Sequence, residues 1–363
     1  MGQVIKLEYG KSLKGYQESE GSVRVYGTNG PIGYTDEALC DTPSLIIGRK
    51  GAYRGVHYSP GPLFVIDTAF YTKSLQENLS EKFLYYWFQT IDFDDMDSGS
   101  AIPSTSRDEV HDLDILLPSP NEQEAIAEVL SSLDDKIDLL NRQNATLEVL
   151  AKAIYRDAMT SSQGWTEVPL SEVTERITDG AHKSPATFDE GMPMASVKDM
   201  TDWHIEIPGC RRISEADYAE LVEMDCRPLK GDILIAKDGS YLKHVILVEN
   251  DMDLVLLSSI AILRPNDSIH PMLLAIWLKL NSTINDMQYI VSGTVIPRIV
   301  LKDFRKFPFP LPPKEEQKVL VERIKPLFEK CWANNREVAT LTQMRDTLLP
   351  RLMSGAARID LGE

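Results

Sequence analysis

The chain carries one sequence twice, and this repeat limits its possible architecture more than any other feature. Residues 292–355 align without a gap on residues 98–161, so that the string SGSAIP at 98 recurs as SGTVIP at 292. Further along, LPSPNEQ recurs as LPPKEEQ, which places Gln317 at the position of Gln123. Two homologous halves in one chain predict a pseudo-two-fold symmetric molecule.

Composition sets the broad class. With 363 residues, of which 43% are hydrophobic and 26% charged, the chain is typical of a globular protein with more than one domain. It has no run of about 18 apolar residues and no signal peptide at its start. We therefore expect a cytoplasmic protein that does not enter a membrane. The four cysteines are too scattered for a CxxC pair, which predicts neither zinc nor disulfides.

The charge balance bears on which partner the chain can bind. Two similar heads suit a partner with two similar sites, and duplex DNA is the commonest such partner. The net charge of −17 opposes this interpretation, because affinity for DNA depends largely on lysine and arginine side chains that neutralise phosphates. If the partner is DNA, either positive charge gathers on small patches or basic partner subunits supply most phosphate contacts.

Each copy of the repeat predicts a long helix. Ser119 can cap the first helix, with Pro120 at its first position and Glu122 reaching back to the cap. Apolar residues then recur at alternating steps of four and three, which is the seam of a coiled coil. The second copy has a matching seam, with Asn334 and Arg345 as polar interruptions. Because neither seam can stay exposed, we expect the two helices to pack together as an antiparallel coiled-coil stem. The alternative is that each seam packs on its own head.

The sequence outside the stem forms two heads, at 1–117 and 164–311. Both mix short β-rich runs, such as SLIIG at 44 and GDILIA at 231, with modest helices such as SEKFLYYWFQ at 80 and PMLLAIWLKL at 271. This predicts α/β or α+β domains with mixed sheets. The long helices are expected at 118–163 and 312–357, and a C-terminal tail at 358–363.

One segment of each head combines cations and aromatics on a turn. In the first head it is GRKGAYRGVHY at 48–58, and in the second it is KDGSYLKH at 237–244. Arginine can clamp a phosphate or bond a guanine edge, and tyrosine can stack or donate to phosphate. The alternative is an ordinary solvated hairpin. The residues that we predict to contact DNA are Arg49, Lys50, Tyr53, Arg54 and His57 in the first head, and Lys237, Tyr241, Lys243, His244 and Arg298 in the second.

Arg298 belongs to the repeated loops SGSAIPSTS at 98–106 and SGTVIPRIV at 292–300. These loops could touch DNA or only brace each head on its helix. Their Gly, Ile and Pro positions match, whereas the positions after Pro103 and Pro297 diverge, and divergence fits sequence reading.

Motifs of enzymatic chemistry are missing from the sequence. It has no GxxxxGK[ST] phosphate loop, no NPPY-type loop for a flipped adenine and no HExxH zinc motif. We therefore predict a non-enzymatic chain with no catalytic residue, no metal site and no cofactor of its own.

Together these features resemble the specificity subunit of type I restriction-modification enzymes, which has two variable heads, each followed by a long repeat helix. The resemblance covers nearly the whole chain and rests on YGTNGPIGY, IIGRKGAYRGVHY, VIDTAFY and the two helix starts. It implies that each head is a target recognition domain for one half of a bipartite DNA sequence. It also implies that the paired helices set the spacing of the halves and dock two methyltransferase subunits.

The resemblance further implies what the partners do. The methyltransferase subunits would bring S-adenosylmethionine for adenine methylation. Restriction-translocase subunits, held through the methyltransferase subunits, would bring ATP and magnesium for translocation and cleavage. One alternative is a protein-assembly scaffold without DNA reading, which the net charge of −17 would suit. Another is the recognition subunit or a fragment of a related bifunctional restriction-methylation enzyme.

Overall fold

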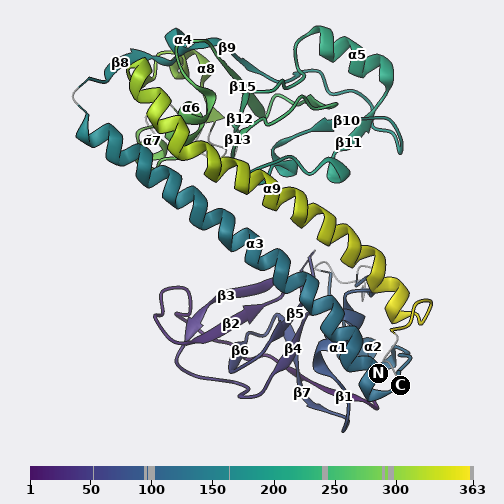
Figure 1. Ribbon diagram of the computed structural model, residues 1–363. Coiled ribbons are helices and arrows are strands. Elements are labelled where there is room, and N and C mark those ends of the chain that lie inside the picture. The colour runs from purple at the N-terminus through teal and green to yellow at the C-terminus, as the bar shows by residue number, and fades with distance from the viewer. Residues whose placement is uncertain are drawn as a thin grey trace. The chain divides into compact units, whose positions relative to one another are not determined.

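The computed structural model describes residues 1–51, 53–93, 96, 103–162, 164–238, 244–287, 291–292 and 298–359 (Figure 1). The chain forms two compact units, of which the first comprises Met1–Asp138 with Ala339–Glu363 and the second Leu139–Val338. Each unit contains one head, part of the long helix α3 (Pro120–Ser161) and part of the long helix α9 (Lys314–Met353).

In its described residues, the head of the first unit has two sheets and two short helices. One sheet has the strand order β1-β7-β4-β5 and is antiparallel, and the other has the order β3-β2-β6 with β2 and β6 parallel. The elements are β1 (Ile5–Tyr9), β2 (Val23–Gly27), β3 (Gly30–Thr35), β4 (Ser44–Gly48), β5 (Val56–Ser59), β6 (Leu63–Val65), β7 (Ala69–Leu75), α1 (Glu81–Phe88) and α2 (Arg107–Asp112).

The head of the second unit contains the same two sheets and several additions. Its sheets have the orders β13-β12-β15-β9 and β11-β10-β14, and a further pair joins β18 to β8. The elements are β8 (Thr166–Pro169), α4 (Leu170–Val173), β9 (Thr174–Asp179), β10 (Met192–Ala195), η1 (Val197–Asp199), η2 (Ile207–Gly209), β11 (Arg211–Ile213), α5 (Glu215–Glu223), β12 (Ile233–Ala236), β13 (Val245–Leu247), β14 (Val255–Leu256), β15 (Ile260–Pro265), α6 (Pro271–Leu278), α7 (Asn281–Asp286), β16 (Val291–Ser292), β17 (Arg298–Ile299), α8 (Leu301–Phe304) and β18 (Pro308–Leu311).

The two heads repeat one topology in matching register. Ile47 of β4 pairs with Phe70 of β7, and Ile235 of β12 pairs with Ala261 of β15. In each head the strand pair β2/β6 or β10/β14 is parallel, although the other pairs of the two sheets are antiparallel. The prediction of mixed α/β heads is thus confirmed, and the homology extends beyond the repeat that the sequence reveals.

A buried helix supports the main sheet of each head. Helix α6 is apolar on all sides and is buried from Met272 to Leu278, as expected for a helix covered on every face. In the first head, Phe83, Leu84 and Phe88 of α1 pack in one cluster with residues of β4 and β7. Each core then extends to the stem: the first includes Ile126 and Leu130 of α3, and the second includes Leu320 and Ile324 of α9.

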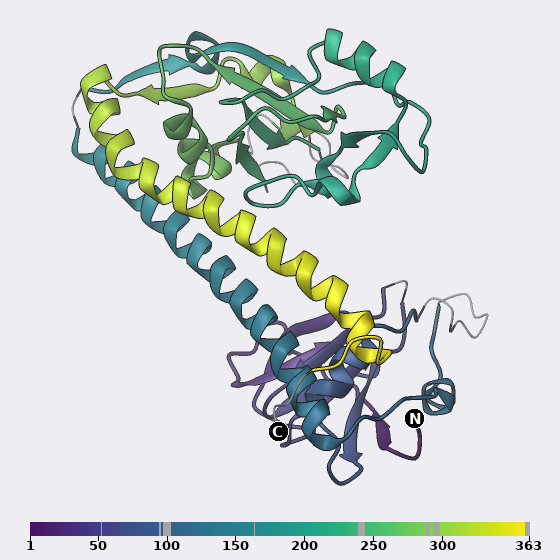
Figure 2. The same cartoon turned by 45° about the vertical axis from the view of Figure 1, so that its right-hand side comes forward.

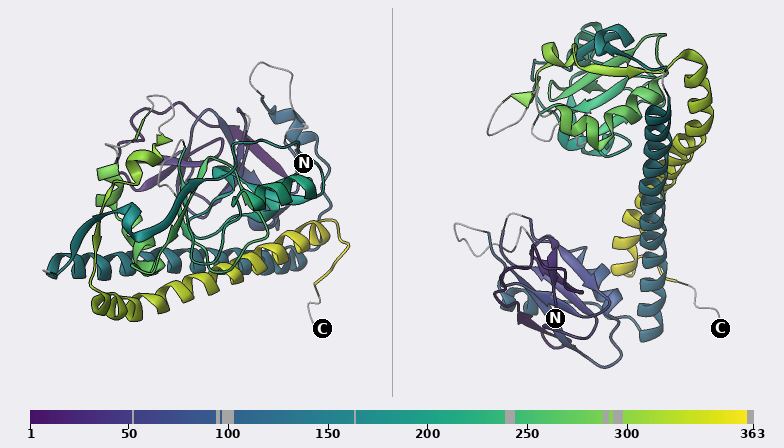
Figure 3. Two further views of the ribbon diagram at one scale, coloured as in Figure 1. Left: turned by 90° about the horizontal axis from the view of Figure 1, so that it is seen from above. Right: turned by 90° about the vertical axis from the view of Figure 1, so that its left-hand side faces the viewer.

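Helices α3 and α9 run antiparallel within both units. In the first unit, Asp134 of α3 forms an ion pair of 2.8 Å with Arg345 of α9. In the second unit, the Nδ2 of Asn334 in α9 donates to the Oδ1 of Asn144 in α3, at 2.8 Å. Figures 1 and 2 show the helices side by side, and Figure 3 shows them from two further directions. The predicted antiparallel coiled coil is confirmed, and both polar interruptions that the sequence marks find partners across the seam.

The repeated glutamine joins each head to its stem helix. Gln123 is buried, and its side chain accepts from the N–H of Ser80 (3.0 Å) and donates to the carbonyl of Pro118 (3.0 Å). Gln317 accepts from the N–H of His270 (3.2 Å) and donates to the carbonyl of Pro312 (2.9 Å). Ser80 and His270 are the N-caps of α1 and α6. One amide therefore closes the same head-to-helix joint in each unit.

The glutamate before each glutamine holds the segment that follows the other long helix. Glu316 accepts from the indole N–H of Trp165 (2.7 Å), just after α3. Glu122 accepts from the guanidinium of Arg358 (3.1 Å), just after α9. The sequence analysis expected Glu122 to reach back to its own helix cap; this was wrong, because the carboxylate forms a charged pair with Arg358 instead. In the described residues, no helix is long and apolar enough to cross a membrane.

We predict that the glutamine joint contributes measurably to stability. Replacing Gln123 or Gln317 by alanine leaves a half-buried backbone N–H and a carbonyl without this partner, which should lower the free energy of unfolding of the affected unit by about 1–3 kcal/mol. Urea titration of the full chain measures the change. Gln343→Ala, on the exposed surface of α9, is the matched control and should have an effect within about 0.5 kcal/mol. Equal effects at all three sites would contradict the joint.

Candidate nucleic-acid interface

Two segments that the sequence analysis selected separately meet in the first head. The turn after β4 lies against the loop after Pro103: the N–H of Gly51 donates to the carbonyl of Pro103 (3.0 Å), and the N–H of Thr105 donates to the carbonyl of Arg49 (3.0 Å). Lys50 and Ser104 form a β-bridge between these two contacts. The hairpin and the repeated loop therefore form a single surface.

The second head builds the same surface at the equivalent positions. The N–H of Ile299 donates to the carbonyl of Lys237 (3.2 Å), and Asp238 and Arg298 form the bridge that corresponds to Lys50 and Ser104. We call this surface the recognition tip; among the described residues it comprises 49–51, 53–57 and 103–105 in the first head, and 237–238, 244 and 298–299 in the second. Its backbone frame is repeated, whereas its side chains differ.

The predicted arginines of the first head hold the tip together. The guanidinium of Arg49 lies 5.0 Å from the ring centre of Tyr9 and donates to the carbonyl of Asp67 (3.0 Å). Arg54 is only 9% exposed and donates to the hydroxyl of Thr105 (2.9 Å). Both cations thus have internal partners, and their contact with DNA stays a prediction.

The other predicted residues of the first head lie closer to solvent. Tyr53, at the apex of the turn, is 79% exposed and is the most exposed large hydrophobic side chain among the described residues. Lys50 is half-buried beside Ser104. The tyrosine is therefore the side chain of this tip that is best placed to meet a ligand without rearrangement of the head.

His57 of β5 is half-buried at the foot of the first tip. Its Nε2 is buried and has no hydrogen-bond partner in the described residues. Burial lowers the pKa of the His57 imidazole below its ordinary value of 6.5, because the charged ring would lose its hydration. At neutral pH the residue is therefore an uncharged member of the tip, and its contact with DNA stays a prediction.

The predicted basic residues of the second head that the structure describes each lie against a carboxylate. Lys237 is 3% exposed, and its Nζ lies 2.8 Å from Asp179. The Nδ1 of His244 lies 3.0 Å from Asp202. Arg298 binds Asp238 through two hydrogen bonds of 2.9 and 3.0 Å. Tyr241 and Lys243 lie outside the described residues. Within its described residues, this tip therefore presents basic side chains that are each paired with a carboxylate.

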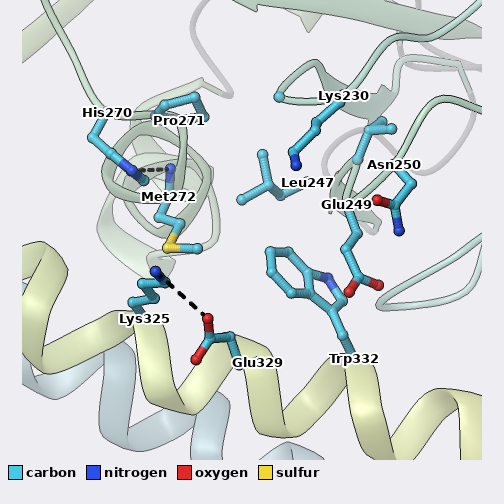
Figure 4. A pocket seen from close by; sticks show the side chains of 12 residues that line it. Lys230, Leu247, Glu249, Asn250, His270, Pro271, Met272, Lys325, Glu329 and Trp332 are labelled. Carbon is cyan, nitrogen blue, oxygen red and sulfur yellow. Dashed lines mark hydrogen bonds and ion pairs between the residues drawn. The ribbon is translucent and has the colours of Figure 1, made fainter.

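A groove between head and stem recurs in both units. In the second unit it has a volume of about 440 Å³, and Figure 4 shows its lining, with Trp332 of α9 pointing toward Leu247 of β13 and the side chain of Lys230 above them. In the first unit the equivalent groove has a volume of about 300 Å³ and is lined by Tyr58, Tyr85, His57 and Ser131, the last at the repeat position of Lys325. The position is shared, but the linings differ in polarity.

Sequence reasoning missed the acidic partners and the loop contacts of the tips. Asp238 and Asp179 were not selected, although they orient Arg298 and Lys237. One signal could have found the first pair. Ser104 and Arg298 occupy the same repeat position, each directly after a proline. Because a hydroxyl in one copy is replaced by a cation in the other, an acidic partner for Arg298 could have been sought on the neighbouring hairpin.

Comparison with known proteins finds relatives along most of the chain. Residues 1–149 and 162–343 match the family described as type I restriction modification DNA specificity domain. The chain is 24% identical over 315 residues to the type I restriction enzyme MjaIX specificity subunit of Methanocaldococcus jannaschii, across 78% of this chain and 71% of that protein. It is 20% identical over 395 residues to the EcoDI specificity subunit of Escherichia coli, across 99% and 87%.

A solved structure shows the same fold. The S subunit of a type I restriction-modification system from M. genitalium aligns over 99% of this chain and 95% of that chain, with a TM-score of 0.59 and 19% identity. At this identity the likeness concerns the architecture of heads and helices, and not the residues of the tips.

We predict that the stability of the first unit falls below pH 7 because of His57. The unfolded chain takes up a proton near pH 6.5, whereas the folded state resists it, so the unfolded state binds more protons as pH falls and the free energy of unfolding decreases. His57→Gln should make this decrease shallower between pH 7 and the lower pKa of the folded state. Urea titrations at several pH values measure the effect, and an NMR titration that gives His57 a pKa at or above 6.5 would contradict it.

Proposed function

The chain belongs to the type I restriction modification DNA specificity family, and we propose that it selects the DNA target of such a complex, with one head for each half of a bipartite sequence. The observation that carries this proposal is the recognition tip, whose backbone frame occurs in both heads with different side chains. Phosphates are the same along every duplex, but base edges differ. A repeated frame with divergent side chains suits two readers of different half-sites.

The internal partners of the cations support the idea that partner subunits make most of the phosphate contacts. Arg49, Arg54, Lys237 and Arg298 all have partners within their own head, and the chain carries a net charge of −17. Because binding to DNA requires phosphate neutralisation, most of that positive charge would come from other subunits of the complex. The heads would then contribute selectivity more than affinity.

Exposed apolar side chains on the stem helices support docking of two methyltransferase subunits. Leu150 of α3 is 47% exposed, as is Met344 of α9, and the two occupy the same repeat position. Leu139 and Val149 add exposed apolar surface on α3. Isolated exposed apolar residues are common, but the same position in both repeat copies suits two copies of one partner.

The chemistry of the complex would belong to these partners. The chain matches specificity subunits, which are non-catalytic. The methyltransferase subunits would use S-adenosylmethionine to methylate adenine, and restriction-translocase subunits held through them would use ATP and magnesium. This chain itself would supply the duplex-reading surface and the stem on which the complex assembles.

Mapping of methylated adenines tests the proposal. The full chain is expressed with the methyltransferase subunit encoded beside it, and the methylated adenines of a plasmid of known sequence are located by single-molecule sequencing. We expect methylation at one bipartite motif, absent without this chain. A stable complex with an active methyltransferase but no motif would favour the assembly scaffold. Methylation and cleavage by a single bifunctional partner polypeptide would favour the other alternative.

We predict that Tyr53→Ala weakens the reading of one half-site only. The side chain is exposed at the apex of the first tip, so its loss should cost about tenfold in affinity for that half, in the range of a single mismatched base pair. Binding of the assembled complex to duplexes altered in either half measures the effect. Tyr34→Ala removes another exposed tyrosine of the same head, outside the tip, and serves as the control. Equal loss at both halves would contradict the assignment.

A further inference from the structure

The bridge between Asp238 and Arg298 fixes an arginine at the surface of the second tip. The Nε of Arg298 donates to one carboxylate oxygen (2.9 Å) and its Nη2 donates to the other (3.0 Å). The Asp238 side chain is mostly buried, whereas 58% of the Arg298 side chain is exposed. The carboxylate therefore belongs to the frame, and the guanidinium projects from it.

This mode of pairing leaves a defined edge of the guanidinium for a ligand. A planar guanidinium carries five N–H donors, and Asp238 takes the one on Nε and one of the two on Nη2. The edge between Nη1 and Nη2 points away from the carboxylate and, within the described residues, still offers two parallel donors. In the major groove, guanine presents two parallel acceptors, N7 and O6, and a bidentate arginine is their commonest partner.

A base is a better match for this arginine than a phosphate. A phosphate contact carries no sequence information and would serve both heads equally, yet the equivalent bridge in the first head is Lys50 with Ser104. The flanking backbone contact that is described in both heads is the same, through Thr105 in one and Ile299 in the other. The side chains thus change where the frame does not, as reading of different bases requires.

We propose that Arg298 recognises a guanine in the half-site read by the second head, and that Asp238 is a positioning residue that holds its guanidinium plane. The inference rests on the proposed function and adds to it the base that one residue selects. The first head has no fixed fork at the equivalent bridge, because lysine offers a point charge and serine a hydroxyl. Its half-site is therefore read by different chemistry.

Binding measurements on the assembled complex test the inference. The wild-type motif is first mapped by methylation, and duplexes with each base pair of both halves exchanged are then titrated. For the wild type, exchange of one G·C pair should weaken binding roughly 5- to 150-fold, the range of a bidentate arginine contact. For Arg298→Ala and Arg298→Lys, this exchange should no longer matter, whereas the dependence on the other half should be unchanged.

Two further variants separate positioning from charge. Asp238→Ala keeps the arginine but removes the carboxylate that fixes the orientation of its guanidinium. Discrimination at the same G·C pair should therefore fall, while the salt dependence of binding stays the same. Lys302→Ala removes a nearby exposed cation and should leave every base preference unchanged.

Several outcomes would overturn the inference. One is that Arg298→Ala weakens binding to all duplexes equally, which indicates a phosphate contact. Another is that the variant keeps the wild-type base preference. A third is that the mapped motif has no G·C pair in the half read by the second head. These outcomes differ from failure of the proposed function, in which the wild-type complex has no bipartite motif at all.

Discussion

The structure depends on the burial of two apolar seams that neither long helix can bury alone. Leu130 of α3 and Leu352 of α9 share one core with the first head, and Ala151 of α3 and Ile324 of α9 share another with the second. Each helix therefore packs both on a head and on the other helix. The sequence left open whether the seams pack on each other or on the heads, and the structure shows both. The apolar stripe of each long helix is wide enough to contact the other long helix and also the helix that supports the sheet of a head.

The glutamine joint and the tip frame separate geometry from recognition. Gln123 and Gln317 bond backbone groups of the head, and so do the contacts at Thr105 and Ile299. Backbone groups are present whatever the side chains are, so a head can change the residues at its tip without losing its place on the stem. Most of the described cations at the tips stabilise the tip itself, since they already form hydrogen bonds or ion pairs within the head in the absence of DNA.

The long-range order of the molecule could be predicted from the sequence, and the details of the tips could not. Repeat and heptad spacing identified α3, α9 and their polar interruptions, because these signals are local in the chain. The partners of Arg54 and Lys237 are not local: Thr105 and Asp179 come close only once the sheets have formed. From the sequence, cations near aromatic residues were predicted to be free to bind phosphate. In the folded heads, those that the structure describes are partly or fully buried, and a buried polar group that lacks a hydrogen-bond partner lowers stability, so these cations bond to groups of the head instead. The half-burial of His57 was also missed, because it arises only once the head has folded.

The buried amides of the stem also select one register of the two long helices. Asn334 and Asn144 are almost fully buried, and Asn334 also donates to Gln143 at 2.8 Å. A stem slipped by one helical turn would place Asn334 beside Leu140 and leave both amides without partners. Each unpaired amide costs about 1–3 kcal/mol, and every 1.4 kcal/mol is about a tenfold change in population. Stems with a slipped register would therefore be populated far less than the native stem, so the two amides specify how the helices align.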